Sequence, residues 1–219
     1  MNPSITVITI CSRPKYLDDI YNSIISQNYD NFKWIISFDS NNSIKLKYND
    51  NRITTIKYKN KNNDVTNYAA LNNIFDNINL NNEWLCIIDD DNIMYPNYLN
   101  EISKVINNKL QFIYYQQCYS NDVLRFTSRT KDIKEGHIDM AQVCFKSNLI
   151  EYTRFEQRYT ADGDFYSMLF QKIKHDKSKW YIINKVLCYY NYLVQSTKES
   201  TIINQKNISL KSNIMYYGE

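Results

Sequence analysis

The sequence predicts an α/β fold, in which helices flank a Rossmann-type, mixed and mostly parallel sheet. Strand-like and helix-like stretches alternate along the first half of the chain. The apolar run Leu85–Ile88 has no polar alternation, which is typical of a strand buried on both faces of a parallel sheet. The acidic run Asp89–Asp91 follows directly, so it is expected at the carboxyl end of that strand, where open α/β sheets bind ligands.

The first half of the chain supplies the elements of this alternation. A β-branched run predicts the first strand at Ile5–Ile10. Ser12 as N-cap and Pro14 in the first turn predict the start of an amphipathic helix that ends near Gln27. Two more strands and one more helix are expected before Leu85, at Phe32–Phe38, Arg52–Tyr58 and Asn67–Ile78 respectively.

The second half of the chain is expected to continue the pattern. In order, the predicted elements are a helix at Asn97–Asn107, a strand at Leu110–Tyr115, a polar loop at Asn121–Lys134, a strand at Ile138–Phe145, a short helix at Leu149–Arg154, a helix at Phe165–Ile173 and a strand at Trp180–Tyr190. The tail from Gln195 is polar and carries no predicted element. No repeat or linker divides the sequence, so residues 1–219 are expected to form one domain.

Composition excludes several classes of protein. A net charge of +3 with dispersed lysines does not indicate a nucleic-acid partner. The five cysteines have no C-x-x-C spacing and an odd count, which favours buried, reduced thiols and a cytoplasmic protein over a disulfide framework. No signal-peptide core and no apolar run of about 18 residues is present, so no targeting or membrane-spanning segment is predicted. The sequence predicts no oligomeric state.

The acidic run Asp89–Asp91 needs a compensating partner. Two unit charges ~4 Å apart repel each other by roughly 4 kcal/mol at an effective dielectric constant of ~20. A cation, a bound proton or open water would relieve that repulsion. Carboxylate oxygens suit a hard divalent ion, Mn²⁺ or Mg²⁺, whereas the alternative interpretation is a solvated acidic turn.

Four stretches resemble, in order, the motifs of the inverting nucleotide-sugar glycosyltransferases of family 2, which have the GT-A fold. They are Val7–Leu17, Ile35–Ser40, Asn67–Asn72 and Glu83–Leu99, with a weaker fifth match at Ala161–Leu169. The resemblance covers about residues 3–170. It implies a GT-A-like domain whose nucleotide-binding part spans about residues 1–100 and whose acceptor side spans about residues 101–219.

The resemblance also implies a set of donor-site residues. Contacts to the nucleotide sugar are expected from Thr9, Cys11, Arg13, Asp39, Asn67, Asn72, Asp89 and Asp90. Asp91 is the expected direct ligand of Mn²⁺ or Mg²⁺, while Asp89 faces the ribose or a metal-bound water. Asp90 should point the other way, because side chains alternate along extended chain, and a structural hydrogen-bond role is favoured for it. For Asp39 the alternative role is turn formation, and for Arg13 it is an ordinary surface position.

Inversion requires one general base that takes the proton of the acceptor hydroxyl. Asp162 aligns with the base of the family, and Asp164 is the second candidate. N-capping of the following helix is the alternative role for both. Gly163 between them indicates either a positive φ or a close approach of substrate. The chain departs from the family pattern in having no Glu before Asp162 and no His in Tyr189–Thr197, so the sequence does not identify a third protein ligand for the metal.

The expected activity is metal-dependent, inverting transfer of a sugar from a nucleoside diphosphate sugar to a hydroxyl acceptor such as a glycan. UDP is the expected nucleotide, with GDP and dTDP as alternatives. The alternative function is a catalytically inactive GT-A scaffold that binds sugars or other proteins. A haloacid-dehalogenase-like phosphatase is disfavoured, because its acidic pair follows the first strand whereas Asp89–Asp91 lies mid-chain. The loops Asn121–Lys134 and Tyr152–Tyr159 are expected to select the acceptor.

Overall fold

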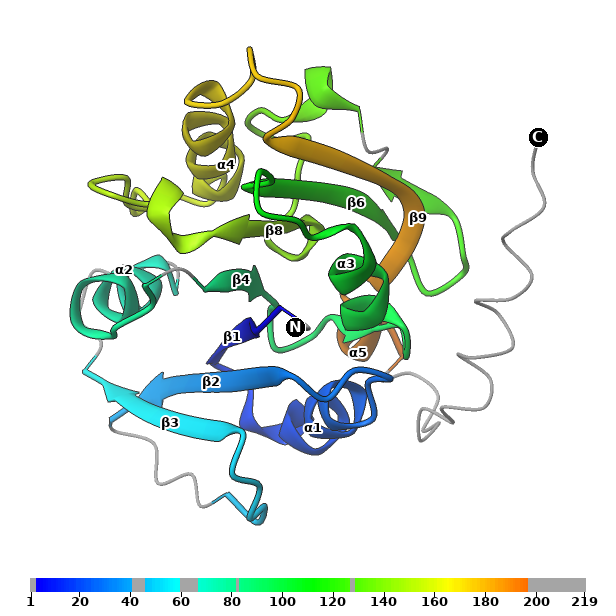
Figure 1. Ribbon diagram of the computed structural model, residues 1–219. Helices are drawn as coiled ribbons and strands as arrows, with labels where there is room; N and C mark the ends of the chain where they lie inside the picture. The colour runs from blue at the N-terminus through cyan, green and yellow to red at the C-terminus, as the bar shows by residue number, and fades with distance from the viewer. Residues whose placement is uncertain (1–2, 41–45, 60–66, 82, 127–128, 197–219) are drawn as a thin grey trace.

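The computed structural model describes residues 3–40, 46–59, 67–81, 83–126 and 129–196. A mixed sheet runs through this part of the chain in the order β3-β2-β1-β4-β8-β6-β9-β5, with β7 paired to β6 (Figure 1). The strands are β1 Ile5–Cys11, β2 Phe32–Asp39, β3 Ile53–Tyr58, β4 Trp84–Ile87, β5 Ile93–Met94, β6 Phe112–Cys118, β7 Leu124–Phe126, β8 Val143–Lys146 and β9 Trp180–Tyr189. The helices are α1 Leu17–Ile25, α2 Tyr68–Asn77, α3 Tyr98–Val105, α4 Ala161–Gln171 and α5 Tyr192–Ser196.

The sheet has a parallel half and a mixed half. β1 pairs in parallel with β2 and β4, and β2 with β3, so the carboxyl ends of these strands share one edge. β8 pairs antiparallel with both β4 and β6, and β9 returns parallel to β6. The predicted α/β fold with a mixed sheet flanked by helices is therefore confirmed, and its parallel half places the turn after β4 beside the turn after β1.

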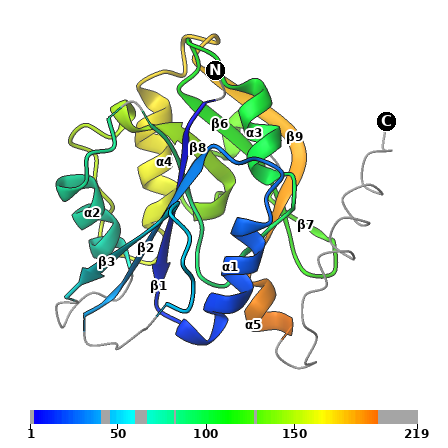
Figure 2. The same cartoon turned by 60° about the horizontal axis from the view of Figure 1, so that its bottom comes forward.

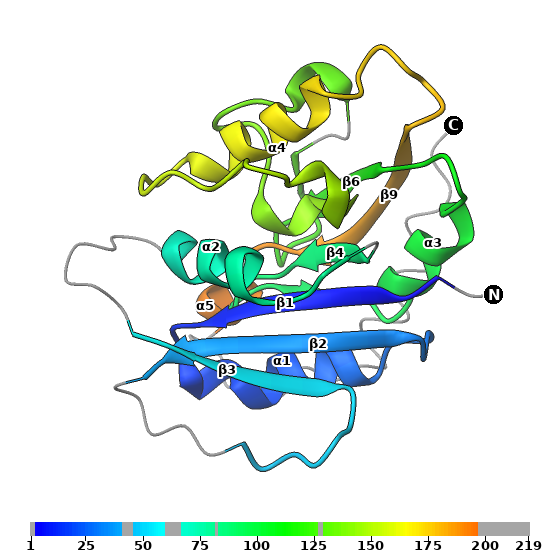
Figure 3. The same cartoon turned by 60° about the vertical axis from the view of Figure 1, so that its left-hand side comes forward.

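Helices cover both faces of the sheet because alternate strand residues point to opposite sides. In β1, Val7 packs into the core beneath α1, α3 and α5, whereas Ile8 packs into the core beneath α2 and α4. Figure 3 shows α1 and α2 on opposite sides of β1 and β2. Figure 2 shows α5 beside α1, and the backbone N–H of Leu193 in α5 donates to the Asp91 carbonyl (3.2 Å). The last described helix thus flanks the acidic turn.

Several element boundaries differ from the expectation. The helix predicted from Ser12 begins with a 3₁₀ turn at Pro14–Tyr16, and α1 follows it. α4 begins at Ala161, four residues early, because Ala161 packs into the core with Phe165. Asp162 and Asp164 therefore lie inside the first turn of the helix rather than before it.

Other segments also differ from the prediction. The predicted loop Asn121–Lys134 contains strand β7 and a 3₁₀ turn at Thr130–Asp132. A 3₁₀ turn replaces the first residues of the strand predicted from Ile138. The short helix predicted at Leu149–Arg154 does not form: a 3₁₀ turn at Ser147–Leu149 ends where it was expected to begin, and turn residues follow. The two-residue strand β5 was not predicted, since it gains its pairing only from β9.

The described helices are short. None of them combines the length and the apolar character that crossing a bilayer requires. The predicted polar tail lies almost entirely outside the described residues, which end at Ser196.

Candidate active site

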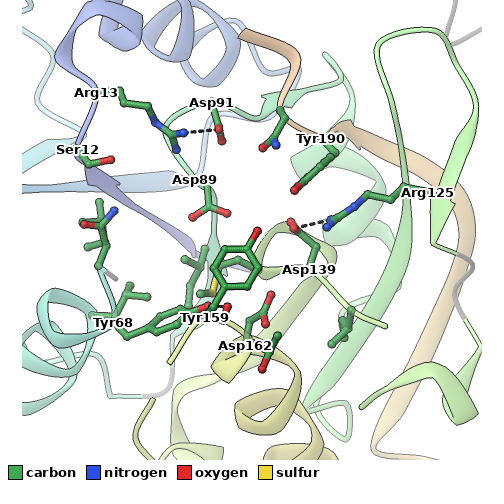
Figure 4. Close-up of a pocket in the computed structure, with 18 of the residues that line it drawn as sticks. Ser12, Arg13, Tyr68, Asp89, Asp91, Arg125, Asp139, Tyr159, Asp162 and Tyr190 are labelled. Atoms are coloured by element: carbon green, nitrogen blue, oxygen red, sulfur yellow. Dashed lines mark hydrogen bonds and ion pairs between the residues drawn. The ribbon is translucent and has the colours of Figure 1, made fainter. Parts of the chain in front are cut away.

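A cavity of about 550 Å³ opens where β1 and β4 end, between α2 and α4 (Figure 4). Its walls come from the turns after β1 and β4, from the first turns of both helices and from the segments around residues 136–140 and 190. The lining residues are Ile10, Ser12, Arg13, Asn67, Tyr68, Leu71, Ile87, Asp89, Asp91, Arg125, Gly136, Ile138, Asp139, Met140, Tyr159, Thr160, Asp162, Tyr190 and Asn191. Among the predicted site residues, Arg13, Asn67, Asp89, Asp91 and Asp162 meet here.

The three aspartates after β4 divide between two directions. Asp89 and Asp91 line the cavity, whereas Asp90 turns away and is only 2% exposed. Asp90 accepts hydrogen bonds from the backbone N–H groups of Ser12 (2.6 Å) and Arg13 (2.5 Å). The acidic turn is thereby fixed to the turn after β1, as the structural role predicted for Asp90 requires.

Arg13 joins two of these carboxylates. Its guanidinium contacts Asp90 through Nη2 (2.6 Å) and Nε (2.8 Å), and Asp91 through Nη1 (2.6 Å). Burial raises the pKa of Asp91 to about 6. The positive charge of Arg13 lowers this pKa, whereas the negative charges of Asp90 and Asp139 raise it further. Arg13 thus offsets part of the negative charge of Asp90 and Asp91, and its guanidinium is held in place at the cavity wall.

Asp89 faces the cavity in a crowded acidic environment. Burial raises its pKa well above the usual range, and the charges of Asp139, Asp91 and other nearby aspartates add to the effect. A divalent cation beside Asp89 and Asp91 would relieve this repulsion, and their oxygen atoms are suitable ligands. Within the described ranges, no group of three or more His, Cys, Asp or Glu side chains is arranged to hold a metal. The donor set therefore fits an ion of the Mg²⁺ type, which typically uses one or two carboxylates and takes its other ligands from substrate phosphates and water.

Asp162 approaches the cavity from the opposite side, in the first turn of α4. Burial raises its pKa to about 7, and the charge of Asp139 adds to the shift. The backbone N–H of Gly163, which donates to Asp162 Oδ1 (2.8 Å), opposes part of it. A carboxyl with a pKa near neutrality can accept a proton at physiological pH and release it again.

Gly163 is required by a close approach rather than by a positive φ, but the group that approaches is the protein's own backbone and not the substrate that the sequence suggested. A Cβ atom at this position would lie 2.5 Å from Glu135 Cα and 2.8 Å from the Lys134 carbonyl oxygen. The segment around Glu135 therefore packs directly on the first turn of α4, next to Asp162.

The second candidate base, Asp164, does not line the cavity. Its carboxylate forms an ion pair with Arg158, whose guanidinium also contacts Glu156 and Glu135. The structure therefore separates the two aspartates that the sequence left as alternatives, and only Asp162 faces the other carboxylates.

Besides Asp90, four predicted donor contacts lie outside the lining of this cavity. Thr9 is fully buried and accepts a hydrogen bond from Trp34 Nε1 (3.1 Å). Cys11 is also buried, and burial raises the pKa of its thiol to about 12. The Asn72 amide donates to the Phe155 carbonyl (2.8 Å) and accepts from the Phe155 N–H (2.9 Å). Thr9, Cys11 and Asn72 are thus occupied by packing within the protein, and Asp39 ends β2 beyond the cavity wall.

Sequence reasoning missed a buried pair on the cavity wall. Asp139 accepts from Arg125 Nη1 (2.6 Å) and from Gln117 Nε2 (2.9 Å), and it caps the 3₁₀ turn that precedes β8. The Arg125 guanidinium lies 3.3 Å from the ring centroid of Tyr190. The capping pattern Asp139-x-x-Gln142 is readable in the sequence, but it indicates only a turn. Its proximity to Arg125 depends on β7, which was not predicted.

Comparison with known proteins gives the following matches. Residues 5–177 match the family model described as glycosyl transferase family 2. Crystal structures of S. aureus TarS 1–349 are similar to this chain: the complex with UDP has a TM-score of 0.64 at 11% identity, covering 96% of this chain and 70% of that one. The complex with UDP-GlcNAc has a TM-score of 0.58 at 12% identity, with 87% and 58% covered.

A further similar structure is the mannosyltransferase PcManGT from Pyrobaculum calidifontis in complex with GDP-Man and Mn²⁺. It has a TM-score of 0.57 at 12% identity, covering 97% of this chain and 69% of that one. Identities this low show a shared fold alone. No curated protein sequence matches the chain.

Proposed function

The chain belongs to glycosyl transferase family 2 and has the GT-A fold, and we propose that its cavity transfers a sugar, with inversion, from a nucleoside diphosphate sugar to a hydroxyl acceptor. One observation carries the proposal. Asp89 and Asp91 face Asp162 across a single cavity, and burial, together with the charge of Asp139, raises the pKa of all three. This arrangement suits a reaction that needs an anion-binding side and a proton-accepting side.

The anion-binding side would hold the diphosphate. Asp91, with Asp89, would bind Mn²⁺ or Mg²⁺, which when bound neutralises the charge that develops on the leaving diphosphate. Arg13 lies at the same wall and is held by Asp90 and Asp91, so its guanidinium is oriented before a ligand arrives. The similar mannosyltransferase PcManGT was crystallised with both GDP-Man and Mn²⁺, which supports a metal-assisted site of this kind.

The nucleotide would extend from this wall toward the first turn of α2. Asn67 lines the cavity there, and Asp39 at the end of β2 remains the proposed contact for the base. UDP is proposed first, because two of the similar TarS structures are complexes with UDP and with UDP-GlcNAc. GDP is the alternative that the PcManGT complex supports.

The transferred sugar would lie between the acidic turn and Asp162. Asp139 and Arg125 line this part of the cavity and present an acceptor and a donor of hydrogen bonds that are fixed against each other. Asp162 would take the proton of the attacking hydroxyl. Its pKa of about 7 is near the value at which a general base works best at neutral pH.

A donor screen tests the proposal. The protein is incubated with UDP-, GDP- and dTDP-sugars, with and without MnCl₂, and nucleotide release and thermal stabilisation are both measured. We expect one nucleotide class to raise the Tm only when the metal is present and its sugar nucleotide to be hydrolysed slowly. Stabilisation without any hydrolysis or transfer would identify an inactive scaffold. No stabilisation and no hydrolysis with any donor would contradict the proposal.

A further inference from the structure

We infer that the acceptor is a neutral saccharide, one of whose pyranose rings stacks on the exposed aromatic face of Tyr159. This inference rests on the proposed function and names the class of its second substrate. Tyr159 is 82% exposed although it lines the cavity. Among the large apolar or aromatic side chains that are exposed in the described part of the chain, Tyr159 alone lies on the cavity wall.

The backbone that carries this ring is fixed. The Tyr68 hydroxyl donates to the Tyr159 carbonyl (3.2 Å), which joins the segment to the first turn of α2. On either side of Tyr159, Arg158 and Thr160 both bind the Glu135 carboxylate. A rigid, exposed tyrosine provides contact area at a small cost in conformational entropy, which is a property of binding surfaces rather than of packing.

The ring lies on the side from which the acceptor must approach. Tyr159 precedes Asp162 by one turn, and Figure 4 shows its ring over the cavity between Asp162 and Asp89, across from Arg13. Inversion requires the nucleophile to attack opposite the leaving group. With the diphosphate held at Arg13 and Asp91, the attacking hydroxyl comes from the side of Asp162. An acceptor sugar on Tyr159 would present a hydroxyl to that carboxylate.

The charges beside Tyr159 favour a neutral acceptor. The Arg158 guanidinium uses Nε for Glu156, Nη1 for Glu135 and Nη2 for Asp164. Three carboxylates therefore surround this one cation, so the charge beside the ring is negative on balance and would repel an acceptor that carries a phosphate. The aromatic face remains as the recognition element, and it matches the apolar C–H face of a pyranose.

Acceptor kinetics test this inference. The donor that is hydrolysed fastest is combined with methyl β-pyranosides of glucose, galactose and N-acetylglucosamine, and with glycerol and a Ser/Thr peptide as acceptors without a sugar. The variants are Tyr159→Ala, which removes the ring, and Tyr159→Phe, which keeps it. Tyr181→Ala is the matched control, because Tyr181 in β9 is an exposed tyrosine that lies outside the cavity lining and outside the loops expected to select the acceptor. KM, kcat and the ratio of transfer to donor hydrolysis are measured for each.

We expect at least one pyranoside to be glycosylated and Tyr159→Ala to raise its KM roughly tenfold, equivalent to about 1.4 kcal/mol, with a smaller change in kcat. Tyr159→Phe should stay within about twofold of the parent, and Tyr181→Ala should not differ from it. The inference is wrong if Tyr159→Ala keeps the parent KM, if glycerol or the peptide is used as well as the pyranosides, or if no pyranoside is used. Donor hydrolysis distinguishes these failures from failure of the proposed function, since a parent protein that hydrolyses no donor overturns both.

Discussion

The Asp90 carboxylate and Arg13 bind each other through both the backbone N–H and the guanidinium of the arginine, although 77 residues separate them in the sequence. This contact joins the turn after β1 to the turn after β4. It holds the Arg13 guanidinium beside Asp91, so the anion-binding wall of the cavity is assembled before any ligand is present.

Replacing Asp90 is therefore expected to destabilise the fold. Asp90→Ala leaves the Arg13 and Ser12 backbone N–H groups without their acceptor and should lower the free energy of unfolding by about 2–4 kcal/mol. Urea denaturation measures the change. Asp18→Asn is the control, because its ion pair with Lys47 is exposed and such pairs contribute little. Equal stability of Asp90→Ala and the parent would show that the contact does not organise the two turns.

Asp91 is expected to control metal-dependent binding. Asp91→Asn should remove the rise in Tm that UDP or GDP produces with Mn²⁺, because the direct carboxylate ligand is gone. Asp164→Asn, which changes an aspartate outside the cavity lining, should keep the shift. Differential scanning fluorimetry with and without EDTA provides the comparison. A metal-dependent shift of parent size in Asp91→Asn would exclude Asp91 as the ligand.

Asp162 is expected to act in the chemical step alone. Asp162→Asn should bind the nucleotide as the parent does and lose transfer by about 10²–10⁴-fold, the usual contribution of a general base. Asp162 and Asp164 both lie in the first turn of α4, so loss of a stabilising charge there would affect both variants alike. A loss of transfer in Asp162→Asn that Asp164→Asn does not share therefore identifies base catalysis. Transfer at the parent rate by Asp162→Asn would exclude it as the base.

The pKa of Asp162 gives two pH dependences of opposite sign. Transfer should rise with pH through an apparent pKa of about 7, because the base must be ionised. The free energy of unfolding should fall as the pH rises from about 4 to about 7. Between the ordinary value of 3.8 and about 7 the folded protein retains a proton that the unfolded chain has lost, so the free energy of unfolding decreases as pH rises. Relative to the parent, Asp162→Asn should gain about 4 kcal/mol between pH 4 and 8, because a pKa raised from 3.8 to about 7 corresponds to roughly that difference in free energy. An unchanged difference across that range would contradict the raised pKa.

Gly163 links the segment around Glu135 to the base. Gly163→Ala places a methyl group against the backbone of Glu135 and Lys134, and the overlap should cost about 1–3 kcal/mol. Because the displaced backbone adjoins Asp162, transfer should decrease more than nucleotide binding. Gly136→Ala is the comparison: it strains the backbone at a φ of 71°, but its methyl group meets no other atom within 4 Å, so it tests strain without overlap. A fully stable and active Gly163→Ala would mean that the close approach is not needed.

The sequence predicted the parts of this protein whose signals are local. The pattern of side chains alone predicted the buried strand before Asp89 and the β-branched strand β1. The order of the motifs predicted the family, which the match of residues 5–177 confirms. The alternation that sends Asp90 away from Asp89 and Asp91 was also readable, because it is a property of extended chain.

Parts that depend on tertiary packing were not readable. Motif position suggested that Thr9 and Asn72 touch the ligand, but Trp34 and the Phe155 backbone occupy them, and both partners come from other elements. Asp139 and Arg125 meet only because β7 pairs with β6, and an isolated three-residue strand has no sequence signal. A motif therefore locates an edge of the sheet, while packing decides which side chains face the cavity.

A crystal structure of the protein grown with UDP and MnCl₂ tests the central claim most directly. We expect an anomalous manganese peak bound by Asp91 and the diphosphate, with the ribose near Asn67 and the open end of the cavity toward Asp162. A nucleotide bound elsewhere, or a manganese peak with no contact to the acidic turn, would contradict it.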